Sequence, residues 1–405
     1  MLLSLSLMLL VGLSVSYIFK LLKIPSILGY MITGIILGPY VLNLIAPEIL
    51  NISADLRTIA LVVILLRAGL SLNIKDLKQI GITGVLMAFI PASFEIVGVV
   101  IFAPILLGLS LIDSLILGTI LGAVSPAIIV PKMLKLMESK EGTKKSIPQL
   151  ILAGASMDDI YCLVLFASAI SLAQNHTLNF ATFVHLPESI IFGIGLGIGL
   201  GFIFNYLFRK IHMRDTLKVI IVLTTAMLLT VFEDYIKKYV GFSSLLAVIA
   251  LGITLLTLYP KLASRMVRKY EKIWLVAEIL LFVLVGAAVN ILTIKEVGLN
   301  AIILILIILL FRTLGVIFAT LPSKLKFKEK VFVVFAYLPK ATVQASIGAI
   351  PLEMGFASGG VMLSVSVLAI LITATLGSFL IDITHKTLLE KDSVSLEKNE
   401  NKMAV

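Results

Sequence analysis

Apolar residues run along most of this chain in stretches about as long as a helix that crosses a lipid bilayer. Such a helix needs about 20 consecutive apolar residues, and short polar segments separate the stretches here. We therefore predict an all-α polytopic membrane protein with about 13 transmembrane helices. The predicted crossings are 2–20, 25–43, 58–73, 80–108, 112–132, 147–173, 187–208, 217–234, 240–259, 273–292, 298–321, 330–352 and 358–381.

The composition agrees with a membrane setting. Of the 405 residues, 60% are hydrophobic and 14% are charged, and the mean hydropathy is +1.13. A soluble core cannot absorb this much apolar surface, so the soluble globular class is excluded and the lipid bilayer is the expected partner. The formal net charge of +10 would suggest nucleic acid in a soluble protein. Its distribution matters more here, and no nucleic-acid partner is expected.

Lysine and arginine concentrate in alternate loops between the predicted crossings. About 26 of the 33 basic residues fall on one side of the membrane and about four on the other. Because cytoplasmic loops carry the basic excess, this asymmetry predicts a cell-membrane protein with its N-terminus outside. Residues 1–382 form the predicted membrane domain, and 383–405 form a short, charged cytoplasmic tail. The single cysteine, Cys162, allows no intrachain disulfide.

Two adjacent carboxylates, Asp158 and Asp159, lie near the middle of the predicted crossing 147–173. An ionised Asp at mid-bilayer costs between about 3 and more than 10 kcal/mol, so intramembrane acids are normally functional. The alternative is a pair at a helix end that touches the aqueous interface. Roughly a dozen mostly apolar residues flank the pair on either side, which favours an ion or proton site facing a cavity inside the bundle.

Prolines interrupt two other crossings, 112–132 and 330–352. The interrupting residues are Ser125, Pro126 and Pro131 in the first, and Pro339, Lys340, Thr342, Gln344 and Pro351 in the second. Each proline removes a backbone donor and frees a carbonyl, which a membrane tolerates only where protein or water satisfies the loss. Ordinary proline kinks are the alternative, but the matched positions favour two broken helices with their ends aimed at a bound ion.

The spacing of the two broken crossings predicts an internal repeat. They are the fifth and the twelfth predicted crossing, seven places apart, and because seven is odd they run through the membrane in opposite directions. A 6+6 inverted repeat joined by a linker helix has this arrangement. The predicted first repeat is about 1–173, the linker helix about 187–208 and the second repeat about 217–382.

Three further charges lie within or beside apolar runs: Glu95, Arg312 and Lys340. With the Asp pair they give three acids against two bases, so pairing offsets much of the desolvation cost and the surplus acid can hold a cation. We expect Arg312 to stay positive and to pair with Glu95, either alone or shared with Asp158. The alternative, that the Glu95–Arg312 pair has a purely structural role, is left open. Lys340 is expected to neutralise the freed carbonyls of its own broken helix, and Glu278 is either interfacial or part of the ion path.

The strings LGYMITGIILGP, GAVSPAIIVP, GASMDD and YLPKATVQASIG together make the chain resemble the monovalent cation:proton antiporter superfamily. Its nearest branch is the sodium/proton exchangers with an Asp-Asp pair, and the resemblance covers about residues 1–382. It implies a fixed dimerisation domain in a homodimer and a core domain, built from helices of about 80–173 and 298–381, that carries the ion by an elevator-like movement. The two unwound helices would cross beside the Asp pair.

Carried over to this sequence, the resemblance implies Asp159 as the main ion- and proton-binding carboxylate and Asp158 as its accessory. Ser125 would lie at the first crossing point, and Lys340 and Thr342 at the second. Arg312 stands where some relatives have lysine, and Glu95 matches the partner found in the arginine-bearing branch. That departure from lysine leaves the stoichiometry open between electroneutral and electrogenic exchange.

These features together predict a secondary active transporter, not an enzyme, that exchanges Na⁺ or Li⁺ for H⁺ by alternating access and needs no cofactor. A K⁺/H⁺ antiporter or a sodium-coupled symporter of the same fold are the alternatives. An intramembrane aspartyl protease also uses two membrane-embedded Asp residues. Those enzymes place them on different helices, whereas here they are consecutive and no Gly-x-Gly-Asp occurs.

Overall fold

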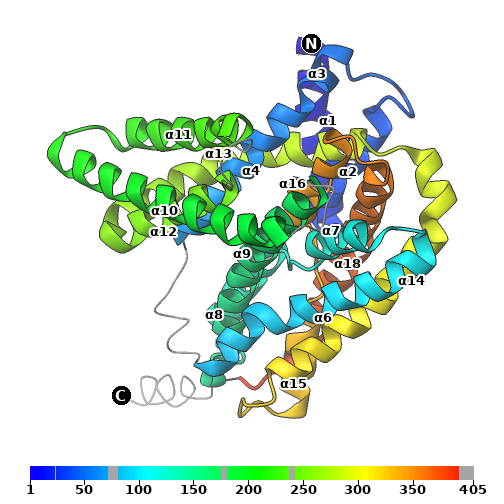
Figure 1. Cartoon of the computed structure of the whole chain (residues 1–405). Coiled ribbons are helices and arrows are strands. Elements are labelled where there is room, and N and C mark those ends of the chain that lie inside the picture. Colours follow the sequence, from blue (N-terminus) through cyan, green and yellow to red (C-terminus); the bar gives the residue numbers. More distant parts are fainter. Residues whose placement is uncertain (23, 72–80, 175–179, 237–241, 392–405) are drawn as a thin grey trace, which may run out of the picture.

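A computed structural model describes residues 1–22, 24–71, 81–174, 180–236 and 242–391, and within these ranges the chain is almost entirely helical (Figure 1). In chain order the elements are α1 (Leu2–Leu21), α2 (Ser26–Leu37), α3 (Pro47–Asn51), α4 (Ser53–Ser71), α6 (Ile82–Leu107), α7 (Leu111–Leu121), α8 (Pro126–Glu138), the 3₁₀ helix η1 (Thr143–Lys145), α9 (Ile147–Gln174), α10 (Phe180–Lys210), α11 (Asp215–Ile236), α12 (Ser244–Leu258), α13 (Pro260–Ala287), α14 (Ile291–Ala319), α15 (Phe327–Ala336), α16 (Thr342–Ile347), α17 (Ile350–Glu353) and α18 (Gly359–Leu388).

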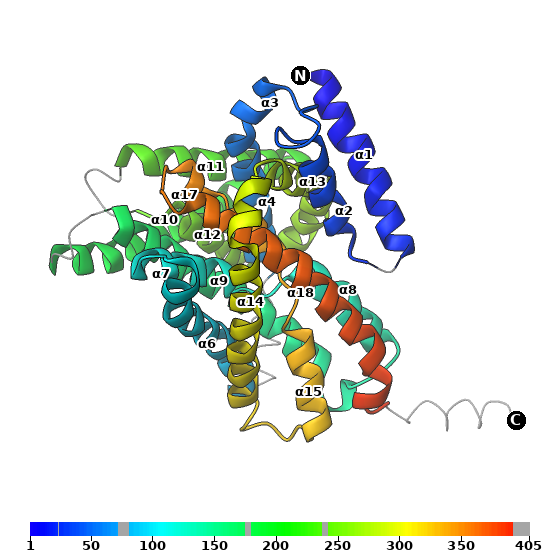
Figure 2. The ribbon, with the colours of Figure 1, turned by 90° about the vertical axis from the view of Figure 1, so that its right-hand side faces the viewer.

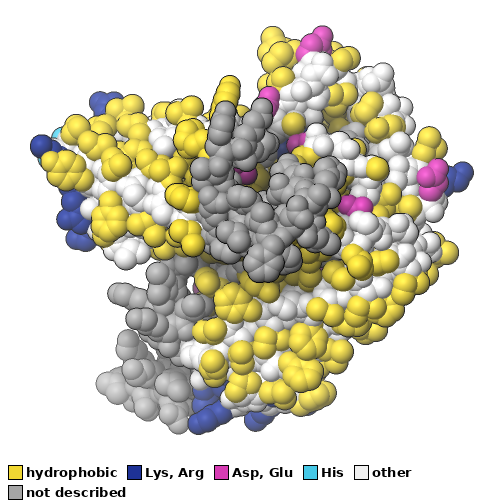
Figure 3. Space-filling view, in the orientation of Figure 1, with side chains coloured by type: hydrophobic (Ala, Val, Ile, Leu, Met, Phe, Trp, Pro, Cys, Tyr) yellow, Lys and Arg dark blue, Asp and Glu magenta, His cyan; other side chains and the backbone are white. Residues whose placement is uncertain are grey.

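The prediction of an all-α membrane fold is confirmed. Within the described ranges, eight helical segments are long and apolar enough to cross a membrane, and α2 and α12 are shorter apolar helices. Figure 3 shows hydrophobic side chains spread over the face formed by α6 and α14, with lysine and arginine gathered at the edges of the molecule. An apolar belt with charged rims is the surface that a bilayer requires.

Helix α13 differs from its prediction, because it begins at Pro260 and not near residue 273. Basic residues assigned to a loop, such as Arg265, lie on its first turns. The helix continues there because it is amphipathic: Met266 and Tyr270 are buried on one face, while Arg265 reaches out to Asp215, 2.6 Å away. Charges end an apolar run without ending a helix.

The helices pack in two groups, seen from two sides in Figures 1 and 2. The core group comprises α6, α7, α8, α9, α14, α15, α16, α17 and α18, and the scaffold group comprises α1, α2, α4, α10, α11, α12 and α13. The groups meet where α9 contacts α10 and α12, and where α16 contacts α4 and α13. The repeat boundaries and the part each group plays in transport stay predictions.

Small residues bring helices of the scaffold group into backbone contact. A Cβ atom at Gly34 on α2 would lie 1.9 Å from the carbonyl oxygen of Val283 on α13, and one at Gly286 would lie 2.2 Å from that of Met31. Only glycine fits at such positions, and close backbone approach is how helices associate where lipid offers no hydrophobic driving force.

Both broken crossings are broken in the structure, but not at every proline. The first break, residues 122–125, separates α7 from α8, and the second, residues 337–341, separates α15 from α16. Pro126 begins α8 and Pro339 lies within the second break. The expectation that Pro131 interrupts the helix is wrong, because Pro131 lies inside α8. A proline removes one hydrogen bond, and a membrane helix continues when its surroundings satisfy the freed group. Pro351 lies in the first turn of α17.

Candidate functional site

The two breaks lie against each other and exchange hydrogen bonds. The backbone N–H of Ser125 donates to the carbonyl of Pro339 at 2.8 Å. The amide of Gln344, on α16, donates to the carbonyls of Ile120 and Ala123 at 3.1 and 2.7 Å. Gln344 therefore satisfies carbonyls that α7 loses where it ends. The second broken helix thus supplies hydrogen-bond partners for backbone groups of the first that a bilayer would leave unsatisfied.

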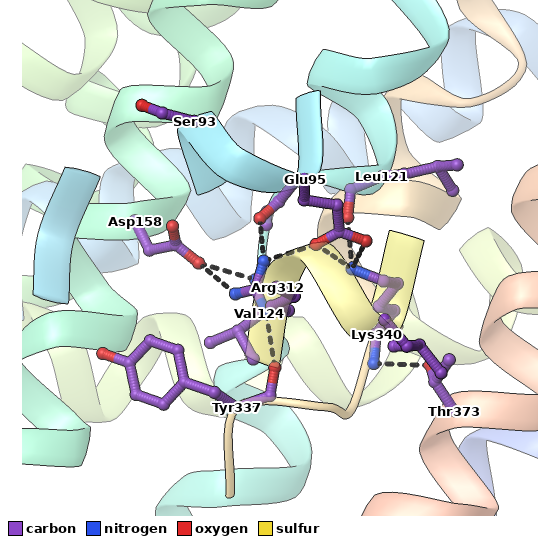
Figure 4. A network of polar contacts seen from close by, with 12 residues as sticks. Ser93, Glu95, Leu121, Val124, Asp158, Arg312, Tyr337, Lys340 and Thr373 are labelled. Atoms are coloured by element: carbon purple, nitrogen blue, oxygen red, sulfur yellow. Dashed lines mark hydrogen bonds and ion pairs between the residues drawn. The ribbon is translucent and has the colours of Figure 1, made fainter. Parts of the chain in front are cut away.

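Arg312, on α14, is the hub of the buried charges (Figure 4). Its Nη1 lies 2.6 Å from Glu95 of α6 and its Nη2 lies 2.8 Å from Oδ2 of Asp158. Its Nε donates to the carbonyl of Tyr337 and its Nη1 to that of Gly122, both at 2.5 Å. All three charged side chains are fully buried. The planar guanidinium thus joins two carboxylates and one carbonyl from each break.

Lys340 extends this network from the second break. Its Nζ lies 2.7 and 2.8 Å from the two carboxylate oxygens of Glu95 and also donates to the carbonyl of Leu121. The expectation that Lys340 neutralises carbonyls of its own helix is therefore wrong: the carbonyl belongs to the last residue of α7. The backbone of Lys340 is held separately, by Thr373 at 3.0 Å, and its side chain reaches the negative end of α7, where the helix dipole favours a cation.

The two adjacent aspartates have different surroundings. Asp158 is fully buried, and its Oδ2 accepts from Arg312 and, at 3.0 Å, from the backbone N–H of Val124. Asp159 is 8% exposed, and its Oδ1 has no hydrogen-bond partner among the described residues. Asp158 is thus tied into the charge network while Asp159 remains open.

The Asp pair and residues at or beside the two breaks carry buried oxygens without a hydrogen-bond partner. Across the part of the chain that the structure describes, the buried oxygens without a hydrogen-bond partner include Oδ1 of both aspartates, Oγ of Ser125, Oγ1 of Thr342 and Oε1 of Gln344. Buried polar atoms normally have a partner, so each such group needs an explanation. Carboxylate and hydroxyl oxygens are the ligands that hard cations prefer, and a desolvated monovalent cation would supply the missing partner.

The charge network also contains main-chain groups that the sequence did not suggest. These are the carbonyls of Leu121, Gly122 and Tyr337, and the N–H of Val124. Main-chain atoms carry no sequence signal beyond the breaks that expose them. Glu278 lies on α13, in the scaffold group, where it interacts with Arg67 and makes none of the contacts described for the network.

Two interrupted helices that cap each other around buried carboxylates define a multi-pass secondary transporter. The fold is that of a known antiporter. The solved structure of the sodium proton antiporter MjNhaP1 from Methanocaldococcus jannaschii superimposes with a TM-score of 0.81 at 22% identity, covering 95% of this chain and 97% of the other. A second structure of MjNhaP1 gives a TM-score of 0.73.

Residues 5–386 match the family described as sodium/hydrogen exchanger, transmembrane, and the chain belongs to this family. Among its relatives, sodium/hydrogen exchanger 9B2 of Mus musculus is 32% identical over 387 residues, which is 93% of this chain and 70% of that protein. The protein of the same name from Homo sapiens is 33% identical over 384 residues. The family is one of multi-pass transmembrane antiporters, and its members are transporters.

Proposed function

We propose that this protein exchanges Na⁺ or Li⁺ for H⁺ across the cell membrane, with Asp159 as the carboxylate for which the cation and the proton compete. One observation carries the assignment: Asp158 is held through its Oδ2 by Arg312 and Val124, whereas Asp159 takes part in neither contact and is 8% exposed. Ionised Asp159, with Ser125 and Thr342, offers oxygens to a desolvated cation. Protonation removes the charge and releases the ion.

Charge counting in the buried site supports an exchange of one proton per cation. With Glu95, Asp158 and Asp159 ionised and Arg312 and Lys340 charged, the site carries a net charge of −1. One bound Na⁺ or one proton brings it to zero. A net charge in a bilayer is costly, so the loaded site moves and the empty, ionised site does not. Because the empty site does not move, exchange is obligatory. Because Arg312 does not release a proton, only one carboxylate titrates per cation, and the ratio is one to one.

Alternating access follows if the core group carries the site past the scaffold group. In this proposal the scaffold group forms the contact of a homodimer, and Ser125, Pro126, Pro339, Thr342 and Gln344 move with the ion. The exchange uses no resident cofactor. The N-terminus faces outward and the tail lies in the cytoplasm, on the side of the lysine- and arginine-rich loops.

Proteoliposomes with an imposed pH gradient test the assignment, by recording the fluorescence change after Na⁺, Li⁺ and K⁺ are added in turn. We expect signals for Na⁺ and Li⁺ from the natural sequence and none from Asp159→Asn. The matched control is Asp113→Asn, which changes an acid on the first turn of α7 and should leave transport intact. Wild-type activity in Asp159→Asn rejects the assignment of Asp159 as the cation site. A signal for K⁺ alone means that the transported ion is K⁺ and not Na⁺ or Li⁺.

The proposed stoichiometry has its own test. Na⁺-driven proton movement is measured in proteoliposomes with and without a membrane potential set by K⁺ and valinomycin. One-for-one exchange moves no net charge, so the initial rate should be the same in both conditions. A rate that follows the applied potential overturns the 1:1 proposal and leaves the Asp159 assignment to its separate test.

A further inference from the structure

Arg57 and Glu353 form an ion pair between the two groups of helices. Arg57 lies near the start of α4 in the scaffold group, and its Nη2 donates to Oε1 of Glu353, the last residue of α17 in the core group. Among the ion pairs between residues that the structure describes, this one alone joins the two groups. The others connect helices or loops of one and the same group. The pair is therefore a charged contact that ties the core to the scaffold.

The pair lies at the end of the molecule where α4 begins. Figure 2 shows α17 in the half that holds α3 and the start of α4, away from the end that holds α15. The loops on that side carry few lysines and arginines, so the proposed orientation places this end outside. Arg57 is only 5% exposed. Because the two groups meet over this residue, the outer side of their interface is closed in this conformation.

Glu353 is connected to the proposed ion site through a short stretch of helix. Helix α16 begins at Thr342, whose buried hydroxyl oxygen has no partner among the described residues. Only Gly348 and Ala349 separate α16 from α17. On α16, Gln344 holds the carbonyls at the end of α7. A displacement of Glu353 relative to the scaffold is therefore transmitted to the second break, and the ion pair holds the outer half of this broken helix in place.

Arg57 is bound less completely than Arg312, the arginine of the charge network. All three nitrogens of the Arg312 guanidinium donate hydrogen bonds, whereas Nε and Nη1 of Arg57 are buried without a partner among the described residues. The side chain of Glu353 is 26% exposed, while both carboxylate partners of Arg312 are fully buried. A buried donor without a partner needs an explanation. A residue that changes its contacts between two conformations supplies one, so the pair is suited to open.

We propose that the Arg57–Glu353 pair is a latch between the two groups, which holds the outer side closed and separates each time the core group carries the site outward. While the latch is closed, the site faces the cytoplasm. When it opens, water reaches the carboxylate of Glu353, and the outer half of the second broken helix is released from the scaffold. The inference rests on the proposed function, in which the core group moves past the scaffold group, and it names two residues that control this movement.

Tethering the two positions tests whether they separate during transport. Arg57→Cys and Glu353→Cys are introduced together, which leaves neither charge without a partner. In proteoliposomes the two thiols are joined by a bifunctional methanethiosulfonate reagent, and mass spectrometry of the linked peptides verifies the tether. We expect the tether to lower Na⁺-driven proton transport by about tenfold or more, because it blocks a conformational step of the cycle. A reductant removes the tether and should restore the rate.

The matched control is an ion pair that lies within one group. Arg265 of α13 and Asp215 of α11 lie 2.6 Å apart inside the scaffold group. Arg265→Cys with Asp215→Cys, tethered in the same way, should transport equally well with and without the tether. The natural Cys162 is buried and is kept in every variant. The natural sequence and the single-cysteine variants, treated with the same reagent, show the effect of the reagent alone.

A second variant removes the latch without a tether. Arg57→Gln combined with Glu353→Gln should increase the fraction of the protein whose site faces outward. Apparent affinity follows the fraction that is competent to bind, so the Na⁺ concentration for half-maximal exchange in right-side-out vesicles should fall by about threefold or more. In everted vesicles, where Na⁺ meets the cytoplasmic side, it should change less.

A tethered Arg57→Cys, Glu353→Cys protein that transports as fast as its reduced form overturns the proposal. Folding is checked by size-exclusion chromatography in detergent. Should the cysteine pair not fold, an unchanged half-maximal concentration in right-side-out vesicles of Arg57→Gln with Glu353→Gln overturns the proposal equally. The natural sequence and Asp159→Asn, run alongside, keep the outcomes distinct. A natural sequence without exchange rejects the proposed function and transport by Asp159→Asn rejects its cation site, whereas an ineffective tether in an active exchanger rejects only the latch.

Discussion

Replacing Arg312 with glutamine removes the group that joins both breaks to both carboxylates. Breaking a buried ion pair by removing one partner costs about 3–5 kcal/mol, because the other charge is left buried and uncompensated. Here Glu95 and Asp158 both lose a donor, at 2.6 and 2.8 Å, and the carbonyls of Gly122 and Tyr337 lose theirs. Each buried acceptor left alone adds about 1–3 kcal/mol. These losses overlap within one network, so we expect at least about 4 kcal/mol in total.

Thermal unfolding of the purified protein in detergent measures this loss. We expect Arg312→Gln to lower Tm by at least about 5 °C. Arg312→Lys keeps the charge, but its compact ammonium cannot span the four acceptors. The Tm of Arg312→Lys should therefore lie between that of the natural sequence and that of Arg312→Gln. In the double variant Glu95→Gln with Arg312→Gln, one acid leaves with one base, and the site returns to a net charge of −1.

The double variant should therefore melt above Arg312→Gln alone, although it lacks one more charged group. That order distinguishes an uncompensated charge from lost packing, which would make the double variant worse. The reasoning fails if Arg312→Gln melts within about 1 °C of the natural sequence, or if adding Glu95→Gln lowers Tm further.

Three smaller changes test other parts of the structure. Gly34→Ala places a Cβ atom 1.9 Å from a carbonyl oxygen of α13 and should destabilise the scaffold group by about 1–3 kcal/mol or more, read as a lower Tm. Glu353→Gln leaves the buried Arg57, its ion-pair partner, without a countercharge; Tm should fall, and adding Arg57→Gln should restore part of it. The hydrogen bond from Lys326 lowers the pKa of Glu390. Its stabilisation is present above the ordinary carboxyl range and lost as pH falls through the lowered pKa; because the pair is exposed, Glu390→Gln should change Tm at neutral pH by less than about 1 °C.

The sequence by itself determined the membrane setting, the helices and the existence of a buried charged site. These follow from local patterns. An apolar run predicts a crossing, and five charged groups inside such runs avoid a high desolvation cost only by pairing with one another. The same reasoning failed where a local signal was ambiguous. Pro131 did not end α8, and the basic residues at the start of α13 did not end that helix.

Only the tertiary structure decided which group meets which. Arg312 and Glu95 are 217 residues apart in the chain, and Lys340 reaches a carbonyl of α7 and not one of its own helix. The difference between Asp158 and Asp159 also arises there, since neighbouring helical residues point about 100° apart and meet different elements. The local pattern carries no information on hydrogen-bond partners from distant segments or on main-chain atoms exposed by a break. The arrangement of the site could therefore be read only from the tertiary structure.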